Sequence, residues 1–262
     1  MTRARRAQSS RAGFGDSLGP HQGESMRVLP FKLAVASACL SLSGCVATAP
    51  VAQQPRADEI PMYGGVDRSA PAVKAADDKL IADATSAFGS RASAAQAWVE
   101  QGFRFYQADQ LGMATRRFNQ AWLMNPDNPG VYTGFAAVLH DQDRFCDAMR
   151  MMEKALVLKP PSFRGIYADA GRIAARCAAQ DPTLTGPERA AMIARSDALY
   201  RNGERVEPDK GYLYYSWATA YYWNGQYADA WTMVAKARQA GGRGNPQFLE
   251  MLRAKMPEPA QH

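Results

Sequence analysis

The stretch that decides the fold is residues 95–126, AQAWVEQGFRFYQADQLGMATRRFNQAWLMNP, because the following part of the chain repeats its pattern. Residues 130–160, GVYTGFAAVLHDQDRFCDAMRMMEKALVLKP, carry small, apolar and proline residues at the same relative positions. The corresponding pairs, each 34 residues apart, are Gly102 and Ala136, Phe105 and Leu139, Ala114 and Ala148, Ala121 and Ala155, and Pro126 and Pro160. A constant period of this length is typical of proteins built from stacked copies of one unit.

The first unit resembles the tetratricopeptide repeat (TPR), which is a pair of antiparallel helices. The residues that carry the resemblance are Trp98, Gln101, Gly102, Phe105, Ala114, Phe118 and Pro126. Gly102 and Ala114 lack bulk where two antiparallel helices must touch, and the rings of Phe105 and Phe118 fill the space beside them. Pro126 ends the second helix because proline lacks an N–H donor and clashes with the preceding turn. One unit leaves an apolar face open, so neighbouring units must stack.

Two further units follow with less regularity. The last one, residues 211–242, keeps Trp217, Tyr221 and Ala230 at the same offsets and ends at Gly241-Gly242 instead of a proline. The unit before it, from Pro160 to Pro208, spans 48 residues and is fourteen residues longer than one period.

The longer third unit contains its own helix signals. We expect its first helix over residues 163–178 and its second helix from Thr185. Thr185-Gly186-Pro187-Glu188 is typical of a capping box with proline at the start of a helix. The extra residues therefore lengthen the connection and the second helix.

These patterns predict an all-α protein. Its folded part is expected to be a TPR solenoid of about four helix-turn-helix repeats over residues 95–245, with flanking cap helices at residues 75–94 and 246–257. The N-terminal cap places Ala76, Leu80, Ile81 and Ala84 on one helical face.

A targeting signal precedes this region. Residues 26–44 combine a positive start, an apolar run of about ten residues and small residues before Cys45, as a secretory signal does. The run is too short for a spanning helix. Leu42-Ser43-Gly44-Cys45 resembles the lipobox of bacterial lipoproteins, which implies cleavage before Cys45 and its acylation. The alternative is a plain signal peptide with an incidental cysteine.

The location of the protein follows from the same resemblance. Val46 follows Cys45, where aspartate commonly retains such proteins in the inner membrane, so we expect an outer membrane lipoprotein that faces the periplasm. Residues 1–25 are either a mis-assigned start or a disordered basic extension. Residues 45–74 are rich in proline and predict a flexible tether. Within the tether, the sequence PMYGG at residues 61–65 either docks on the folded part or forms a simple turn.

The charge of the mature chain is nearly balanced. The sequence holds 31 Lys and Arg against 25 Asp and Glu, but 6 of the former and 2 of the latter lie in residues 1–44. No clustered basic stretch remains, so we expect no nucleic-acid partner. His140 is the one histidine inside the folded region, and metal-ligand spacing, phosphate loops and hydrolase motifs are absent from the sequence. We therefore expect no metal, no cofactor and no enzymatic activity.

The function is expected to reside in a surface. In TPR solenoids the first helix of each unit lines a concave groove, and the repeat register transfers this role to specific positions. The candidate lining residues are Val99, Phe103, Tyr106, Thr133, Ala137, His140, Arg164, Tyr167, Gly171, Tyr212, Tyr215, Thr219 and Tyr222. Tyrosine offers apolar area and a polar tip, as binding surfaces favour. Packing of Tyr212 or Tyr222 against neighbouring helices or caps is the alternative interpretation.

Two functions fit such a groove. The first is a membrane-anchored periplasmic scaffold or adaptor that binds a protein partner of the cell envelope through a peptide or helix. The second is a small-ligand or glycan-binding protein that uses the tyrosines and Trp223 for stacking.

The cysteines give one further prediction. Cys39 is lost with the signal and Cys45 is acylated, so Cys146 and Cys177 remain as a pair in an oxidising compartment. Cys146 falls near the start of the second helix of unit two, and Cys177 near the end of the first helix of unit three. These helix ends meet in a TPR stack. A disulfide and two buried free thiols both fit this placement.

Overall fold

The structure is a computed structural model that describes residues 56–158 and 165–260. All regular elements of these two ranges are helices, so the prediction of an all-α protein is confirmed. The predicted extension at residues 1–25, the signal at residues 26–44, Cys45 and Arg164 lie outside the described residues.

The helices follow one another in pairs along the chain. They are α1 (Pro71–Phe88), α2 (Arg91–Gln107), α3 (Leu111–Met124), α4 (Pro129–Asp141), α5 (Phe145–Val157), α6 (Ile166–Gln180), α7 (Gly186–Val206), α8 (Lys210–Trp223), α9 (Tyr227–Gln239) and α10 (Pro246–Lys255). Two short 3-10 helices, η1 (Ala57–Glu59) and η2 (Pro61–Gly65), precede them.

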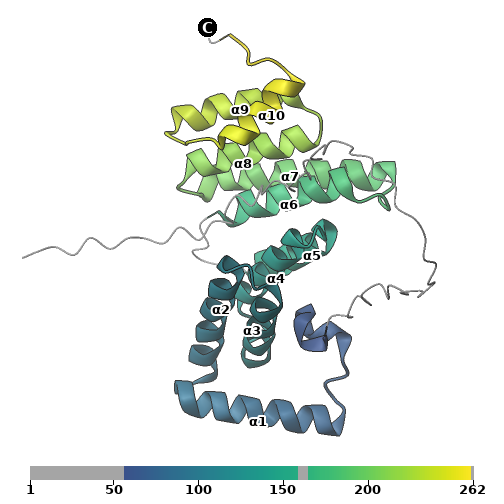
Figure 1. Ribbon diagram of the computed structural model, residues 1–262, viewed down its shortest axis with the longest axis vertical. Helices are drawn as coiled ribbons and strands as arrows, with labels where there is room; N and C mark the ends of the chain where they lie inside the picture. The colour runs from purple at the N-terminus through teal and green to yellow at the C-terminus, as the bar shows by residue number, and fades with distance from the viewer. Residues whose placement is uncertain (1–55, 159–164, 261–262) are drawn as a thin grey trace, which may run out of the picture.

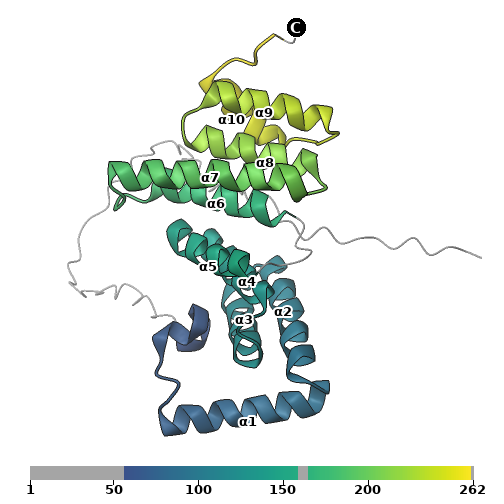
Figure 2. The ribbon, with the colours of Figure 1, turned by 180° about the vertical axis from the view of Figure 1, so that it is seen from behind.

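Helices α2 to α9 form hairpins one to four, in which α2 packs on α3, α4 on α5, α6 on α7 and α8 on α9. We call α2, α4, α6 and α8 the first helices and their partners the second helices. First helices also touch between hairpins, α2 with α4 and α6 with α8, whereas α6 meets the preceding hairpin through α5. Figures 1 and 2 show α1 at one end of the long axis and α9 and α10 at the other.

Three of the hairpins share one turn. Asp109, Asp143 and Gly225 each adopt a left-handed backbone, with φ of 57°, 58° and 75°. In each case the next amide donates to the carbonyl five residues back, at 2.9 Å, as Gln110 does to Phe105. Because asparagine, aspartate and glycine tolerate this conformation best, the residue type fits the geometry. Hairpin three connects its helices differently, through residues 181–185.

The core of hairpins one and two is built around Phe118. Its ring lies between Gly102 and Gly134, where an added Cβ atom would come within 2.4 Å of the ring. The ring also meets Phe103 and Phe135 edge-on, at centroid distances of 5.1 and 6.0 Å. The predicted need for a small residue at position 102 therefore has a direct cause in the ring of Phe118.

Hairpin three is the irregular unit, as the sequence predicts. Thr185 and Glu188 form the expected capping box, with proline in the first turn of α7. Helix α7 contains 21 residues, so the extra length lies partly in this helix. Its Tyr200 packs against Gly171 of α6, where an added Cβ would lie 2.6 Å from the ring.

The two cap helices differ in how well their bounds were predicted. Helix α10 occupies most of the predicted range, and its Phe248 and Leu252 are buried against hairpin four. The predicted cap at residues 75–94 is wrong at both ends, because α1 begins at Pro71 and stops at Phe88. Gly89 ends α1 in a left-handed conformation, and Ser90 then caps α2 by accepting from the amide of Ser93.

The predicted tether at residues 45–74 is wrong from Arg56 onward. Residues 56–66, which we call the strap, contain η1 and η2 and pack on α3. The PMYGG sequence thus docks on the folded part, which is the first of the two interpretations of that sequence. Met62 packs against the same core cluster as Phe118.

Candidate binding surface on the first helices

The first helices present fewer free side chains than the sequence predicts. Val99 is 4% exposed and belongs to the core, so its assignment to a binding groove is wrong. Thr133, Ala137 and Gly171 are also buried.

The aromatic candidates are half-buried. Phe103 and Tyr167 pack against the core of hairpins one and two with part of each ring left accessible. Tyr215 lies against Gly244, whose added Cβ would be 2.5 Å from its ring. Tyr222 meets Phe248 of α10 at a centroid distance of 5.9 Å. The segment that leads into α10 thus covers part of Tyr215 and Tyr222, in line with the alternative interpretation for Tyr222.

Polar groups gather along the same four helices, most of them partly buried. We call Tyr106, His140, Asp141, Asp169, Arg172 and Tyr212 the first-helix polar cluster. In its second half, the Tyr212 hydroxyl donates to Asp169 Oδ1, and Arg172 lies 3.1 Å from the same carboxylate oxygen. Burial raises the pKa of Asp169, although Arg172 and Tyr212 act in the opposite direction. These contacts join α6 to α8.

The other half of the cluster joins α2 to α4. His140 Nδ1 lies 3.0 Å from Asp141 Oδ1, and the Tyr106 hydroxyl also hydrogen-bonds to Asp141. Burial would raise the pKa of Asp141, but the bonds from His140 and Tyr106 outweigh it and lower the pKa. Burial lowers the pKa of His140 despite the neighbouring Asp141, so the imidazole is neutral at pH 7. The charge of Arg172 acts on both Asp141 and His140, which links the halves electrostatically.

Beside this cluster, Arg176 packs against two aromatic rings. Its guanidinium lies 4.3 Å from the ring centre of Phe145 and 4.2 Å from that of Trp223. Asp143 is 3.8 Å away. Cation–π contacts of this kind are favourable by about 0.5–2 kcal/mol. Trp223, the stacking residue of the glycan alternative, therefore has one of its faces engaged by the protein itself.

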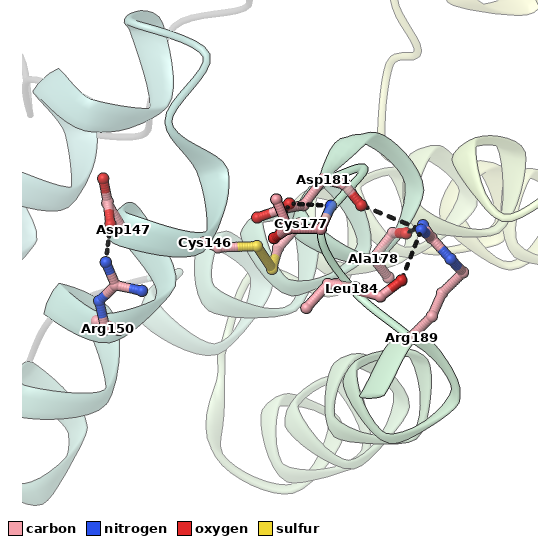
Figure 3. The surroundings of a disulfide bond; sticks show 9 residues. Cys146, Asp147, Arg150, Cys177, Ala178, Asp181, Leu184 and Arg189 are labelled. Atoms are coloured by element: carbon pink, nitrogen blue, oxygen red, sulfur yellow. Dashed lines mark hydrogen bonds and ion pairs between the residues drawn. A yellow bond between two sulfur atoms is a disulfide. The ribbon is translucent and has the colours of Figure 1, made fainter. Parts of the chain in front are cut away.

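A disulfide lies where hairpins two and three meet. Cys146 in the first turn of α5 is bonded to Cys177 near the end of α6, with Cα atoms 4.8 Å apart (Figure 3). Arg189 of α7 supports the adjacent end of α6 by donating to the carbonyls of Ala178, Asp181 and Leu184. Of the two alternatives for Cys146 and Cys177, a disulfide or two free thiols, the structure contains the disulfide.

The sequence did not single out Asp141, Asp169 and Arg172. A signal for two of them exists, since Asp169 and Arg172 stand three residues apart in YADAGRIAARCAA, a helix otherwise rich in alanine. Two ionisable residues on one turn of such a helix indicate a buried pair or a site.

The candidate surface on the first helices consists of aromatic and polar side chains. Within the described ranges, no group of three His, Cys, Asp or Glu side chains is placed to hold a metal ion. Among those same residues, no helix is both long enough and apolar enough to cross a membrane. The surface offers aromatic edges and polar tips held in place by buried ionic contacts.

No protein-family model, curated protein or solved structure matches this chain significantly.

Proposed function

We propose that this protein is a lipid-anchored scaffold of the cell envelope, built as a TPR solenoid of four repeats. The period of 34 residues and the turn shared by three hairpins support the solenoid. The lipobox-like sequence before Cys45 supports acylation and a place in the outer membrane, facing the periplasm.

The first-helix surface is the proposed binding site for an apolar peptide segment, extended or helical, of a cell-envelope protein. The observation that carries this proposal is the set of half-buried aromatic side chains on three of the four first helices, α2, α6 and α8: Phe103, Tyr106, Tyr167, Tyr215 and Tyr222. Half-buried aromatic rings on a rigid support bind with little loss of side-chain entropy, and such anchors contribute on the order of 2 kcal/mol each. The hydrogen bond between the Tyr106 hydroxyl and Asp141 fixes the position of this ring.

The test of the binding site is a fourfold variant, F103A/Y106A/Y167A/Y215A, compared with wild type after cross-linking in cells and affinity purification. We expect the variant to lose defined envelope partners. The control W122A truncates a half-buried aromatic on the second helix α3 and should retain them. If the fourfold variant loses its helical circular dichroism, F103L/Y106F/Y167L/Y215L takes its place. A folded variant with unchanged partners would refute the site.

The anchor has a separate test. The C45S variant should move from the membrane fraction to the soluble periplasmic fraction, because the acylated sulfur is lost. Retention of C45S in the membrane fraction would contradict lipid anchoring.

A further inference from the structure

The strap is held in place by hydrogen bonds between its backbone and the side chain of Asn119. Asn119 of α3 is 0% exposed. Its Nδ2 donates to the carbonyls of Asp58 and Ile60, both at 2.9 Å, and its Oδ1 accepts the amide of Tyr63 at 3.3 Å. All three bonds go to strap backbone. A buried amide without these partners would cost about 1–3 kcal/mol, so docking satisfies Asn119 as well as the strap.

Charge adds to this attachment. Arg116, one turn before Asn119, lies 2.6 Å from Glu59 and 3.3 Å from Asp58. The Glu59 carboxylate lies over Gly112, where an added Cβ would be 3.2 Å from its Oε1. The outer face of α3 thus offers a small residue, a cation and an amide in successive turns, which fits the acidic segment at the start of the strap.

The far end of the strap is also fixed. Arg68 lies 4.1 Å above the ring of Tyr63 and pairs with Asp77 of α1. Met62 and Tyr63 both adopt a left-handed backbone, with φ of 51° and 57°. Such a conformation is unfavourable by about 1 kcal/mol or more for residues other than glycine, and it persists only when surrounding contacts impose it. The contacts with α3 and α1 therefore impose this backbone conformation on the docked strap.

We propose that strap docking sets how far the folded part stands from the membrane and turns the α1 end towards the lipid surface. This inference rests on the proposed acylation of Cys45. The strap lies in the half of the molecule that contains α1, opposite α10 (Figure 1). The described chain therefore begins in that half, beside α3, and hairpins three and four lie in the other half.

Chain length gives the size of the effect. Eleven peptide units join Cys45 to Arg56, and a fully extended chain of that length spans at most about 38 Å. With the strap released, twenty-six units join Cys45 to Pro71 at the start of α1, for an upper limit of about 90 Å. Docking thus shortens the maximal distance between the anchor and the helices by more than half.

The test uses the full acylated protein in vesicles of phosphatidylethanolamine and phosphatidylglycerol. K79C on the exposed side of α1 supplies one free thiol for a donor fluorophore, since Cys146 and Cys177 are bonded to each other. Energy transfer to acceptor-labelled lipid headgroups reports the distance between α1 and the membrane. In parallel, limited trypsin digestion reports strap release through cleavage at Arg68, which is partly buried against Asp77 when the strap is docked.

Two variants release the strap from opposite sides. N119A removes the amide on α3, and Y63P removes the strap's N–H donor and its left-handed backbone without touching α1 to α10. We expect both to lose energy transfer and to be cleaved faster, whereas N202A on α7 behaves as wild type. If Asn119 is needed for folding, Y63P alone carries the test.

Two outcomes would overturn the proposal: unchanged energy transfer in a variant whose strap is rapidly cleaved, or a wild-type strap that is cleaved as fast as in Y63P. A separate measurement shows whether Cys45 is acylated at all. Without acylation, mass spectrometry of the purified N-terminus would show no acyl group, while the cleavage comparison still reports whether the strap docks.

Discussion

Phe118 and Tyr200 occupy corresponding places in two regions of the molecule and solve the same packing problem differently. Each lies on the second helix of its hairpin and packs against a glycine of the first helix, Gly102 or Gly171. Phe118 is surrounded by apolar rings and glycines. Tyr200 stacks on Trp217 at a centroid distance of 5.1 Å, and its hydroxyl lies 3.0 Å from that of Ser216.

The difference extends to the surroundings of each ring. Ser216 donates to the carbonyl of Ala168, so the hydroxyl of Tyr200 joins a chain that links α7, α8 and α6. Asp169 and Glu207 are buried in the same region. The same hairpin arrangement therefore surrounds two different cores. The core around Phe118 is stabilised by apolar packing, whereas the core around Tyr200 also depends on hydrogen bonds and on the protonation state of Glu207.

The largest expected effect is that of F118A. The variant leaves a cavity bordered by two glycines that have no side chains to fill it, and large-to-small changes of this kind cost about 3–5 kcal/mol. Urea unfolding followed by circular dichroism measures the loss. A loss below about 1 kcal/mol would mean that Phe118 is not the centre of this core.

The disulfide joins the two regions and comes next. It closes a loop of 31 residues, and its removal in C146A/C177A should lower the free energy of unfolding by about 3–4 kcal/mol. Wild-type protein in a reducing agent should show the same loss, which serves as the control. Two thiols that react with a labelling reagent in denatured, unreduced protein would rule out the bond.

F118Y tests whether the core around Phe118 tolerates the hydroxyl group that Tyr200 has in its own core. The added hydroxyl would extend from a ring carbon that already lies against Gly134, in a core lined by Phe103 and Phe135. Overpacking and an unsatisfied buried hydroxyl each cost about 1–3 kcal/mol. A midpoint in urea equal to that of wild type would show that the two sites are more alike than the structure indicates.

Y200F makes the reverse exchange and should cost less, about 1 kcal/mol. The ring keeps its place on Gly171 and Trp217, and Ser216 keeps its bond to the carbonyl of Ala168. The comparison between F118Y and Y200F, measured under identical conditions, is the sharpest test of the two regions. Equal losses would remove the distinction.

The smallest expected effect is a pH dependence that belongs to the second region. Burial raises the pKa of Glu207 from 4.5 to about 6, although the amides of Tyr167 and Ala168 donate to it. The folded state then holds a proton that the unfolded state has released, so stability falls as the pH rises from about 4.5 to about 6. The change should be on the order of 1 kcal/mol.

The control for this dependence is a pair of variants. E207Q should flatten the stability profile between pH 4.5 and 6, whereas E250Q, at an exposed position of α10, should leave the profile unchanged. An unchanged profile in E207Q would assign the dependence to other groups.

Much of the fold could be read from local pattern. The period of 34 residues placed hairpins one and two, Thr185 and Glu188 marked the start of α7, and Gly241 marked the end of α9. These signals act within a few residues of each other, or repeat at fixed spacing, so the order of residues contains them. The bounds of α1 were missed because a glycine and a serine divide what reads as one helical stretch.

The candidate surface was predicted less well. Register assigned Val99 to the groove, but burial depends on how hairpins close over one another, and Val99 lies in the core. Tyr215 and Tyr222 were placed on the correct helix, yet the approach to α10 covers part of each ring. Side-chain exposure is a property of the packed assembly of hairpins, which the spacing of one helix does not contain.

The sequence by itself determined the helical class, the repeat, the caps of individual helices and the position of Cys45 after a lipobox-like sequence, because each is a property of neighbouring residues. Only the tertiary structure decided that the strap docks on Asn119, that Cys146 meets Cys177, and that polar side chains from four helices form one cluster. Those contacts join residues far apart in the chain. Their geometry and desolvation arise when the hairpins pack together.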